Sequence, residues 1–211
     1  MRIERLGRLA PALGLAAERE ALARVERDGA DGEALLLWEA DRVAAVLPHS
    51  GDEEAFLLDP HLPGAPVLRR DSGGGAVLVG PGCLNYAFAL SLEARPAFLD
   101  VAWSYDAILG LIARALAAPD ARAEGSDLAV GDRKFGGHAQ RRTRLALLHH
   151  GTILHAFDLA LVGQLLREPE CRPAYRGART HDEFLTNLPL SPDAISAALT
   201  STAHALSSTR A

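Results

Sequence analysis

The sequence is nearly without lysine: Lys134 is the only one, although lysine and arginine together number 22. The chain also has two cysteines, no apolar run long enough to cross a bilayer, and no secretory signal pattern at its start. We therefore expect no membrane association and a cytoplasmic protein. Cys83 and Cys171 lie far apart without metal-site spacing, so we expect free thiols and no zinc centre.

An excess of basic charge is also missing, since the formal net charge is −5. This balance argues against a general nucleic-acid binder, while a local basic patch for phosphates stays open. With 211 residues and 48% hydrophobic content, the chain can bury a substantial core. We expect a single domain over residues 1–211.

The apolar patterns change period along the chain. Helical spacing predicts helices over 10–27, 103–118, 157–166 and 191–206, with Ser191 capping the last one before Pro192. Short apolar runs predict one strand pair at 35–38 and 43–47, a second pair at 76–79 and 84–90, and further strands at 145–148 and 152–154. Residues 51–66 and 120–125 are predicted connections. This mixed order predicts an α/β or α+β fold.

The retention of one lysine among arginines indicates a site that rejects arginine. A lysine ammonium is a compact point charge, whereas a guanidinium is a planar fork. Lys134 lies in the segment Asp132-Arg133-Lys134-Phe135-Gly136-Gly137-His138-Ala139-Gln140, in which two adjacent glycines allow a close approach to the backbone. We expect a ligand to fill the space that these glycines leave.

A second glycine segment follows two arginines. Arg69 and Arg70 precede Ser72, Gly73, Gly74 and Gly75, so fork donors and backbone N–H groups can meet an anion there. The segment lacks the Gly-Lys-Ser/Thr of a Walker loop and the spacing of a dinucleotide loop. His149 and His150 are adjacent in a predicted strand and point to opposite faces, so we expect one in the core and one near the site.

Taken in order, these segments resemble the lipoate–protein ligase family, within the group of biotin and lipoate protein ligases. The matching segments are Arg69-Arg70-Asp71-Ser72-Gly73-Gly74-Gly75-Ala76, Gly82-Cys83-Leu84-Asn85-Tyr86, the Lys134 segment, His150-Gly151-Thr152-Ile153-Leu154, Arg172-Pro173-Ala174-Tyr175-Arg176 and 181–187. The resemblance implies the catalytic-domain fold of that group, a mixed β-sheet flanked by helices.

The resemblance also implies an ATP-dependent ligase that converts lipoate to lipoyl-AMP and then acylates a lysine of a lipoyl-domain protein, with Mg²⁺ beside the phosphates. Lys134 is the expected catalytic residue. The residues expected to bind substrate or nucleotide are Arg69, Arg70, Ser72, Gly73, Gly74, Gly75, Ala76, Asn85, Asp132, Gly136, Gly137, His138, Ala139, His150, Gly151 and Thr152. A basic rim of Arg141, Arg142 and Arg144 is a candidate contact for an acidic acceptor.

Alternatives of other kinds stay open. An octanoyltransferase would move the acyl group from acyl carrier protein through a cysteine thioester, with Cys83 or Cys171 as nucleophile. Residues 121–130, where the resemblance places that nucleophile, contain no cysteine. A biotin ligase is disfavoured by the different glycine loop, and a non-catalytic acyl-binding homologue by the retained lysine. Some ligases of this family have an extra C-terminal accessory domain, and the 24 residues after Asn187 are too few for one. We therefore expect a single catalytic domain without that accessory domain, which acts with a separate accessory subunit or as an unaided short ligase.

Overall fold

Two β-sheets and the helices around them make up the computed structural model, which describes residues 1–59 and 65–209. The larger sheet has seven strands in the order β1-β2-β6-β10-β9-β8-β7. It is mixed, because β1 and β2 run parallel and the other neighbours run antiparallel. The smaller sheet has the order β4-β3-β5. The predicted mixed sheet with flanking helices is confirmed.

The bounds of the elements follow the chain. The strands are β1 (Arg2–Leu9), β2 (Ala34–Ala40), β3 (Ala44–Leu47), β4 (Val67–Arg69), β5 (Val77–Val79), β6 (Cys83–Ser91), β7 (Ala121–Glu124), β8 (Asp127–Val130), β9 (Arg133–Arg142) and β10 (Ala146–Leu154). The α-helices are α1 (Pro11–Asp28), α2 (Glu53–Phe56), α3 (Val101–Leu116), α4 (Ala160–Leu165), α5 (His181–Phe184) and α6 (Pro192–Ser207). Short 3₁₀ helices are η1 (Gly29–Gly32), η2 (Pro96–Leu99) and η3 (Ala174–Arg176).

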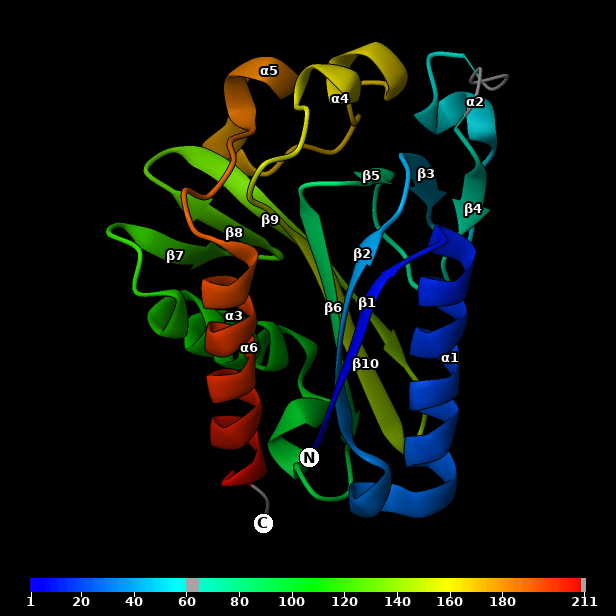
Figure 1. The fold of residues 1–211 in the computed structure, drawn as a ribbon, viewed down its shortest axis with the longest axis vertical. Coiled ribbons are helices and arrows are strands. Elements are labelled where there is room, and N and C mark those ends of the chain that lie inside the picture. Colours follow the sequence, from blue (N-terminus) through cyan, green and yellow to red (C-terminus); the bar gives the residue numbers. More distant parts are fainter. Residues whose placement is uncertain (60–64, 210–211) are drawn as a thin grey trace.

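Helices cover both faces of the large sheet (Figure 1). Helix α1 buries a stripe that includes Leu15, Leu22 and Val25 against β2, β6 and β10. Helices α3 and α6 pack against each other on the opposite face, over a core that contains Tyr86 and Phe135. The central strands are therefore buried on both faces, which explains their unbroken apolar runs.

The predicted helices are found at 11–28, 101–116 and 192–207. Ser191 caps α6 as expected, since its side chain accepts a hydrogen bond from the Ala194 N–H at 3.2 Å. The helix expected over 157–166 is shorter, because α4 covers only Ala160–Leu165. No helix in the described ranges combines the length and the apolar character needed to span a bilayer.

Both predicted strand pairings are wrong. β2 and β3 lie in different sheets, and so do β5 and β6; β3 pairs with β5, and β6 lies between β2 and β10. The cause is that the chain crosses between sheets at the short links that look like hairpin turns. The runs at 145–148 and 152–154 belong to one strand, β10.

Some elements give no apolar signal in the sequence. Edge strand β1 is mostly exposed, with the sequence RIERLGRL, and β7 is half-buried with the sequence ARAE. β7 lies in the predicted connection 120–125, and α2 lies in the predicted connection 51–66, of which 60–64 fall outside the described residues. Edge strands contact the core on few positions, so hydrophobic periodicity does not reveal them.

Candidate functional site

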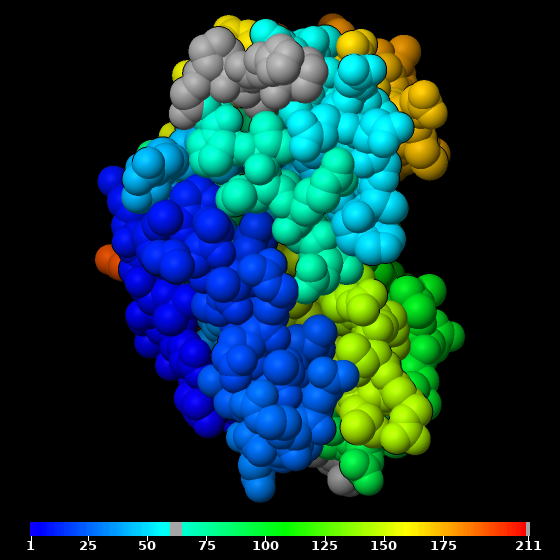
Figure 2. All heavy atoms as spheres, turned by 90° about the vertical axis from the view of Figure 1, so that its right-hand side faces the viewer, coloured from blue at the N-terminus to red at the C-terminus, as the bar shows by residue number. Residues whose placement is uncertain are grey.

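A pocket of about 170 Å³ opens on the α1 face of the large sheet. Figure 2 shows α1, the turquoise segment after β4 and the yellow-green end of β9 and β10 meeting on this side of the molecule. The pocket is lined by Leu15, Glu18, Trp38, Val46, Arg70, Gly74, Gly75, Ala76, Val77, Val79, Asn85, Ser126, Asp127, Lys134, Gly137, His138, Ala139, His150, Gly151 and Thr152. It therefore collects residues from both sheets and from α1.

A β-bulge turns Lys134 into this pocket. Consecutive residues of β8 pair with Gly136 and with Lys134, which leaves Phe135 as an extra residue in β9. Such a bulge shifts the alternation of side chains by one position and can redirect a side chain. Lys134 consequently lines the same pocket as Gly137 and Ala139, whereas Phe135 is fully buried in the core.

The ammonium of Lys134 has a fixed partner. Its Nζ lies 2.7 Å from Asp127 Oδ1, and the second oxygen of Asp127 accepts a hydrogen bond of 2.9 Å from the Tyr175 hydroxyl. Burial and the neighbouring Asp127 carboxylate raise the pKa of Tyr175, so this hydroxyl stays protonated and donates. An ammonium has three N–H donors, so two remain for oxygen atoms of a ligand.

Gly137 provides the room for this lysine. A Cβ atom on Gly137 would lie 2.9 Å from Lys134 Nζ, and a Cβ on Gly136 would lie 2.7 Å from the Thr152 carbonyl oxygen. The expectation that a ligand fills the space beside both glycines is therefore wrong. Lys134 itself and the neighbouring strand β10 occupy that space.

Arg70 braces the glycine loop from inside. Four of its hydrogen bonds go to Ser72 Oγ and to the carbonyls of Val46, Gly73 and Gly75. Burial lowers the pKa of Arg70 to about 10, which leaves the guanidinium charged at neutral pH. A guanidinium has five N–H donors, so only one stays available, and the predicted role of Arg70 as a direct phosphate fork is not supported.

This brace orients the N–H groups of the loop. In a trans peptide the C=O and the next N–H point in opposite directions. Because the carbonyls of Gly73 and Gly75 turn toward Arg70, the N–H groups of Gly74 and Ala76 point away from it. Gly74 and Ala76 both line the pocket, and Gly74 has a φ of +97°, a conformation suited to glycine. The loop can thus offer N–H donors to an anion.

A chain of buried hydrogen bonds continues from this loop to α1. Ser72 Oγ lies 2.7 Å from His150 Nε2, and His150 Nδ1 lies 2.6 Å from Glu18 Oε2. Trp38 Nε1–H donates to the other oxygen of Glu18 at 3.0 Å. Ser72, His150, Glu18 and Trp38 are each at most 8% exposed. The glycine loop, β10, α1 and β2 are therefore joined by polar contacts behind the pocket.

The two adjacent histidines separate as expected. His150 faces the site, whereas His149 is fully buried on the opposite face, against the rings of Tyr86, Tyr105 and His138. Burial holds the pKa of His149 well below its usual value, and burial lowers the pKa of His138 to about 4. Both rings are therefore neutral at pH 7.

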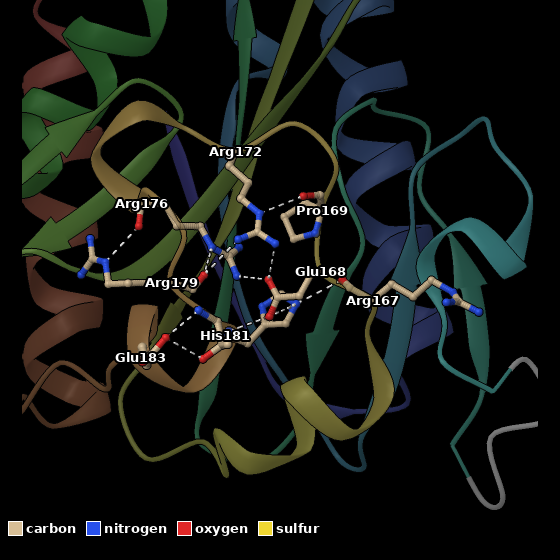
Figure 3. Close-up of polar contacts among 9 residues, drawn as sticks. Arg167, Glu168, Pro169, Arg172, Arg176, Arg179, His181 and Glu183 are labelled. Atoms are coloured by element: carbon tan, nitrogen blue, oxygen red, sulfur yellow. Dashed lines mark hydrogen bonds and ion pairs between the residues drawn. The ribbon is translucent and has the colours of Figure 1, made fainter.

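The segment after α4 packs along the lysine strand. Leu185 forms a bridge with Lys134, and the Thr186 N–H donates to the Lys134 carbonyl at 2.9 Å. Figure 3 shows how this segment is held together: Glu168 pairs with Arg176 and Arg172, and it accepts a hydrogen bond from the His181 backbone N–H. The same segment supplies Tyr175, so it contacts both the backbone of Lys134 and its partner Asp127.

The pocket also has an apolar part. Its residues are Leu15, Trp38, Val46, Val77 and Val79. Trp38 is on β2 and Lys134 is on β9, with β6 and β10 between them. Three strand spacings correspond to about 14 Å. The pocket therefore joins the ammonium of Lys134 to an apolar residue three strands away.

Most of the predicted site residues line the pocket. They are Lys134, Arg70, Gly74, Gly75, Ala76, Asn85, Gly137, His138, Ala139, His150, Gly151 and Thr152. Ser72 lies behind them in a small adjoining pocket with Arg70 and His150. The structure does not bring Arg69, Gly73, Asp132 or Gly136 into the lining. Arg69 is exposed and donates to the Pro48 carbonyl, and Asp132 pairs with Arg179 at the surface.

Sequence reasoning missed Glu18, Trp38, Asp127 and Tyr175. Glu18 did leave a signal, because a carboxylate interrupts the apolar stripe of α1 between Leu15 and Leu22. Such a carboxylate is buried only if it has partners. Asp127 left no comparable signal, and Tyr175 stood in a segment that resembled the family but had no assigned role. Both residues meet Lys134 only through the pairing of β8 with β9 and the packing of the C-terminal segment.

Neither cysteine lines the pocket within the described ranges. Both are free thiols, Cys83 buried and Cys171 exposed. Burial raises the pKa of Cys83 to about 12, which keeps it protonated. Among the residues that the structure describes, no three His, Cys, Asp or Glu side chains group as a metal site. The pocket carboxylates of Glu18 and Asp127 already have partners, so these residues do not fit a dedicated Mg²⁺ site.

A known protein family and several solved structures are similar to this chain. The family model described as the lipoyl protein ligase A/B catalytic domain matches residues 10–199. A chain from a Thermoplasma acidophilum lipoylation system, a bi-partite lipoate protein ligase and its E2 lipoyl domain, superposes with a TM-score of 0.76 at 21% identity, over 97% of this chain and 83% of that one.

Two further solved structures each match 97% of this chain and 85% of their own length. One, from T. acidophilum with bound lipoic acid, has a TM-score of 0.75 and 20% identity. The other, a lipoate-protein ligase A bound with ATP, has a TM-score of 0.74 and 19% identity. These likenesses show a shared fold.

Proposed function

The chain belongs to the family of lipoyl protein ligase A/B catalytic domains, and on this premise we propose that it is an ATP-dependent lipoate–protein ligase. It activates lipoate as lipoyl-AMP and transfers the lipoyl group to a lysine of a lipoyl-domain protein. The observation that carries this proposal is Lys134, which points into the pocket with one donor on Asp127 and two donors free for substrate oxygens. Similar folds with lipoic acid or with ATP bound support both substrates.

Activation joins two anions. A carboxylate oxygen of lipoate attacks the α-phosphorus of ATP, the bond from that phosphorus to the bridging oxygen breaks, and pyrophosphate leaves. Fixed cations and N–H donors must offset the repulsion between carboxylate and phosphate. Lys134 can donate to one oxygen of each group, and the N–H groups of Gly74 and Ala76 supply further donors.

Transfer uses the same cation. The acceptor lysine, as a free amine, attacks the carbonyl carbon of the mixed anhydride. The bond from that carbon to the phosphate oxygen breaks, AMP leaves, and the nitrogen releases a proton to water as the amide forms. Negative charge develops on the carbonyl oxygen and on the departing phosphate. Lys134 stabilises this charge without forming a covalent bond to the acyl group.

Lipoate binds in the pocket in one orientation. Its carboxylate meets Lys134 on β9, and its tail crosses β10 and β6 toward Leu15 and Trp38 in the apolar part. The depth of this apolar part then limits the length of acid that the site accepts. Mg²⁺ accompanies the ATP as part of the substrate, because the pocket carboxylates have other partners.

A thioester mechanism has less support. An octanoyltransferase needs a cysteine thiolate within reach of the acyl group. Cys83 is fully buried with a pKa raised to about 12, and neither it nor the exposed Cys171 is among the described residues that line the pocket. Adenylation requires neither thiol.

Mass spectrometry of an apo lipoyl domain distinguishes the two reactions. Wild-type protein with lipoate and MgATP is expected to add a lipoyl mass, and the double variant Cys83→Ser, Cys171→Ser is expected to do the same. Modification that requires octanoyl acyl carrier protein and no ATP would contradict the ligase proposal. Lipoyl-AMP without a mass shift on the domain would point to a missing accessory subunit or to another acceptor.

A further inference from the structure

Glu18 lies at the end of a chain of donors that begins at the glycine loop. Arg70 Nε–H donates to Ser72 Oγ at 2.9 Å, and Trp38 Nε1–H donates to Glu18 at 3.0 Å. Arginine and tryptophan side chains are donors only, which fixes the direction of hydrogen bonding at both ends of the chain. Ser72 and His150 stand between these ends.

The carboxylate of Glu18 then determines which ring nitrogen of a neutral His150 carries the hydrogen. Because Glu18 accepts at 2.6 Å from His150 Nδ1, a neutral imidazole carries its hydrogen on Nδ1 and presents a lone pair at Nε2. The Ser72 hydroxyl, 2.7 Å away, therefore donates to Nε2 while its oxygen accepts from Arg70. All hydrogen bonds of the chain point toward Glu18.

The same three groups have the order of a nucleophilic serine, a histidine base and a carboxylate. Ser72 is not placed as a nucleophile, however. It is 2% exposed, and its oxygen accepts from the Arg70 guanidinium, so it faces Arg70 and His150 rather than a substrate. Ser72 therefore has a structural position, in which it links Arg70 to His150.

We propose that Glu18 is a positioning residue for the acid-binding loop. By fixing the Nδ1–H form of His150 it directs the Ser72 hydroxyl, and through Ser72 and Arg70 it holds the N–H groups of Gly74 and Ala76 toward the pocket. This role rests on the proposed function, because the ligand that the loop receives is the lipoate carboxylate or its adenylate.

Glu18→Gln tests the direction of the hydrogen bonds with little change in shape. The Gln oxygen still accepts from Trp38, but its amide N–H₂ faces His150 Nδ1, so the ring must move its hydrogen to Nε2. Ser72 then accepts from His150 instead of donating to it. Nitrogen-15 NMR of the ring is expected to report Nδ1–H in the wild type and Nε2–H in the variant. An Nε2–H ring in the wild type would overturn the proposal without any variant.

Lipoate binding to the free protein, measured by calorimetry, gives the functional readout. The Kd is expected to rise about tenfold in Glu18→Gln, the cost of one misdirected buried hydrogen bond. His150→Asn is expected to raise it similarly. If Glu18 acts through His150, adding Glu18→Gln to His150→Asn changes the Kd no further; additive losses would contradict this order of action.

A second Glu–His pair provides the matched control. Glu39 Oε2 lies 3.6 Å from His155 Nε2, and neither residue lines the pocket. Glu39→Gln is expected to leave lipoate Kd unchanged, and an equal tenfold loss would show a general effect of removing a carboxylate. Absence of lipoate binding by the wild type would refute the ligase proposal itself, whereas the NMR experiment tests the His150 orientation independently.

Discussion

At the scale of single residues, the site depends on a lysine whose position is set by a buried carboxylate. Asp127 uses one oxygen for Lys134 and the other for Tyr175. Sequence reasoning instead placed Asp132 in the site, because it belongs to the Lys134 segment that resembles the ligase family. The β8–β9 pairing brings Asp127 to the pocket and leaves Asp132 with Arg179 at the surface.

Asp127→Asn is expected to slow pyrophosphate release about tenfold, since Lys134 loses the charged partner that fixes its ammonium. Asp132→Asn is expected to retain the wild-type rate. A steady-state pyrophosphate assay with lipoate and MgATP compares the two variants directly. A larger loss in the Asp132 variant would favour the sequence-based assignment over the structure.

The buried histidines predict acid sensitivity of the fold. Unfolded histidine has a pKa near 6.5, whereas burial lowers the pKa of His138 to about 4 and that of His149 well below 6.5. Between these values the unfolded chain binds more protons, so the free energy of unfolding falls as pH drops below about 6.5. Each histidine contributes at most about 1.4 kcal/mol per pH unit in this window.

Urea unfolding at pH 5 to 7 measures this dependence. His149→Phe is expected to reduce the slope by the share of one histidine, because phenylalanine keeps the contacts with Tyr86 and Tyr105 and does not titrate. An unchanged slope in this variant would show that other groups dominate acid unfolding.

At the scale of elements, strand β9 and its bulge give Lys134 its direction. The sequence shows the lysine and the glycine pair, but no residue pattern reveals that Phe135 is an extra residue. The bulge is a property of the register between β8 and β9, so the sequence of β9 alone does not predict it. The long amphipathic helices α1, α3 and α6 could be predicted, because each buries a continuous apolar stripe.

Gly137→Ala tests the space beside the lysine. The new Cβ would lie 2.9 Å from Lys134 Nζ, so the flexible end of the lysine must move while the fold is retained. Pyrophosphate release is expected to fall about tenfold, with a melting temperature close to that of the wild type. Gly110→Ala, within α3 and outside the pocket, is the control and should keep full activity. Equal activity in both variants would contradict the tight packing at Lys134.

At the scale of the whole molecule, two sheets and α1 meet around one pocket, and the predicted basic rim lies at the end of β9 and in the turn to β10. Arg141 and Arg144 are exposed. Arg142, the third member of the predicted basic rim, is half-buried and donates to the Phe98 carbonyl, so it supports the packing of η2 instead. Arg141 and Arg144 are therefore the two members of the predicted rim that are exposed, and their contact with an acceptor stays a prediction.

Reversing both exposed charges, in Arg141→Glu with Arg144→Glu, is expected to raise the KM for an acidic lipoyl domain several-fold at low salt, since rim charges steer association. Pyrophosphate release without acceptor should not change. An unaltered KM would exclude this surface from acceptor docking.

We propose that Lys134 acts as a point charge between carboxylate and phosphate. Pyrophosphate release by Lys134→Arg, with lipoate and MgATP, tests it most directly. We predict a fall of about a hundredfold or more while the variant stays folded, because a planar guanidinium cannot take the place of the ammonium beside Asp127 and Gly137. Release at the wild-type rate would contradict this role of the lysine, because any positive charge would then suffice at position 134.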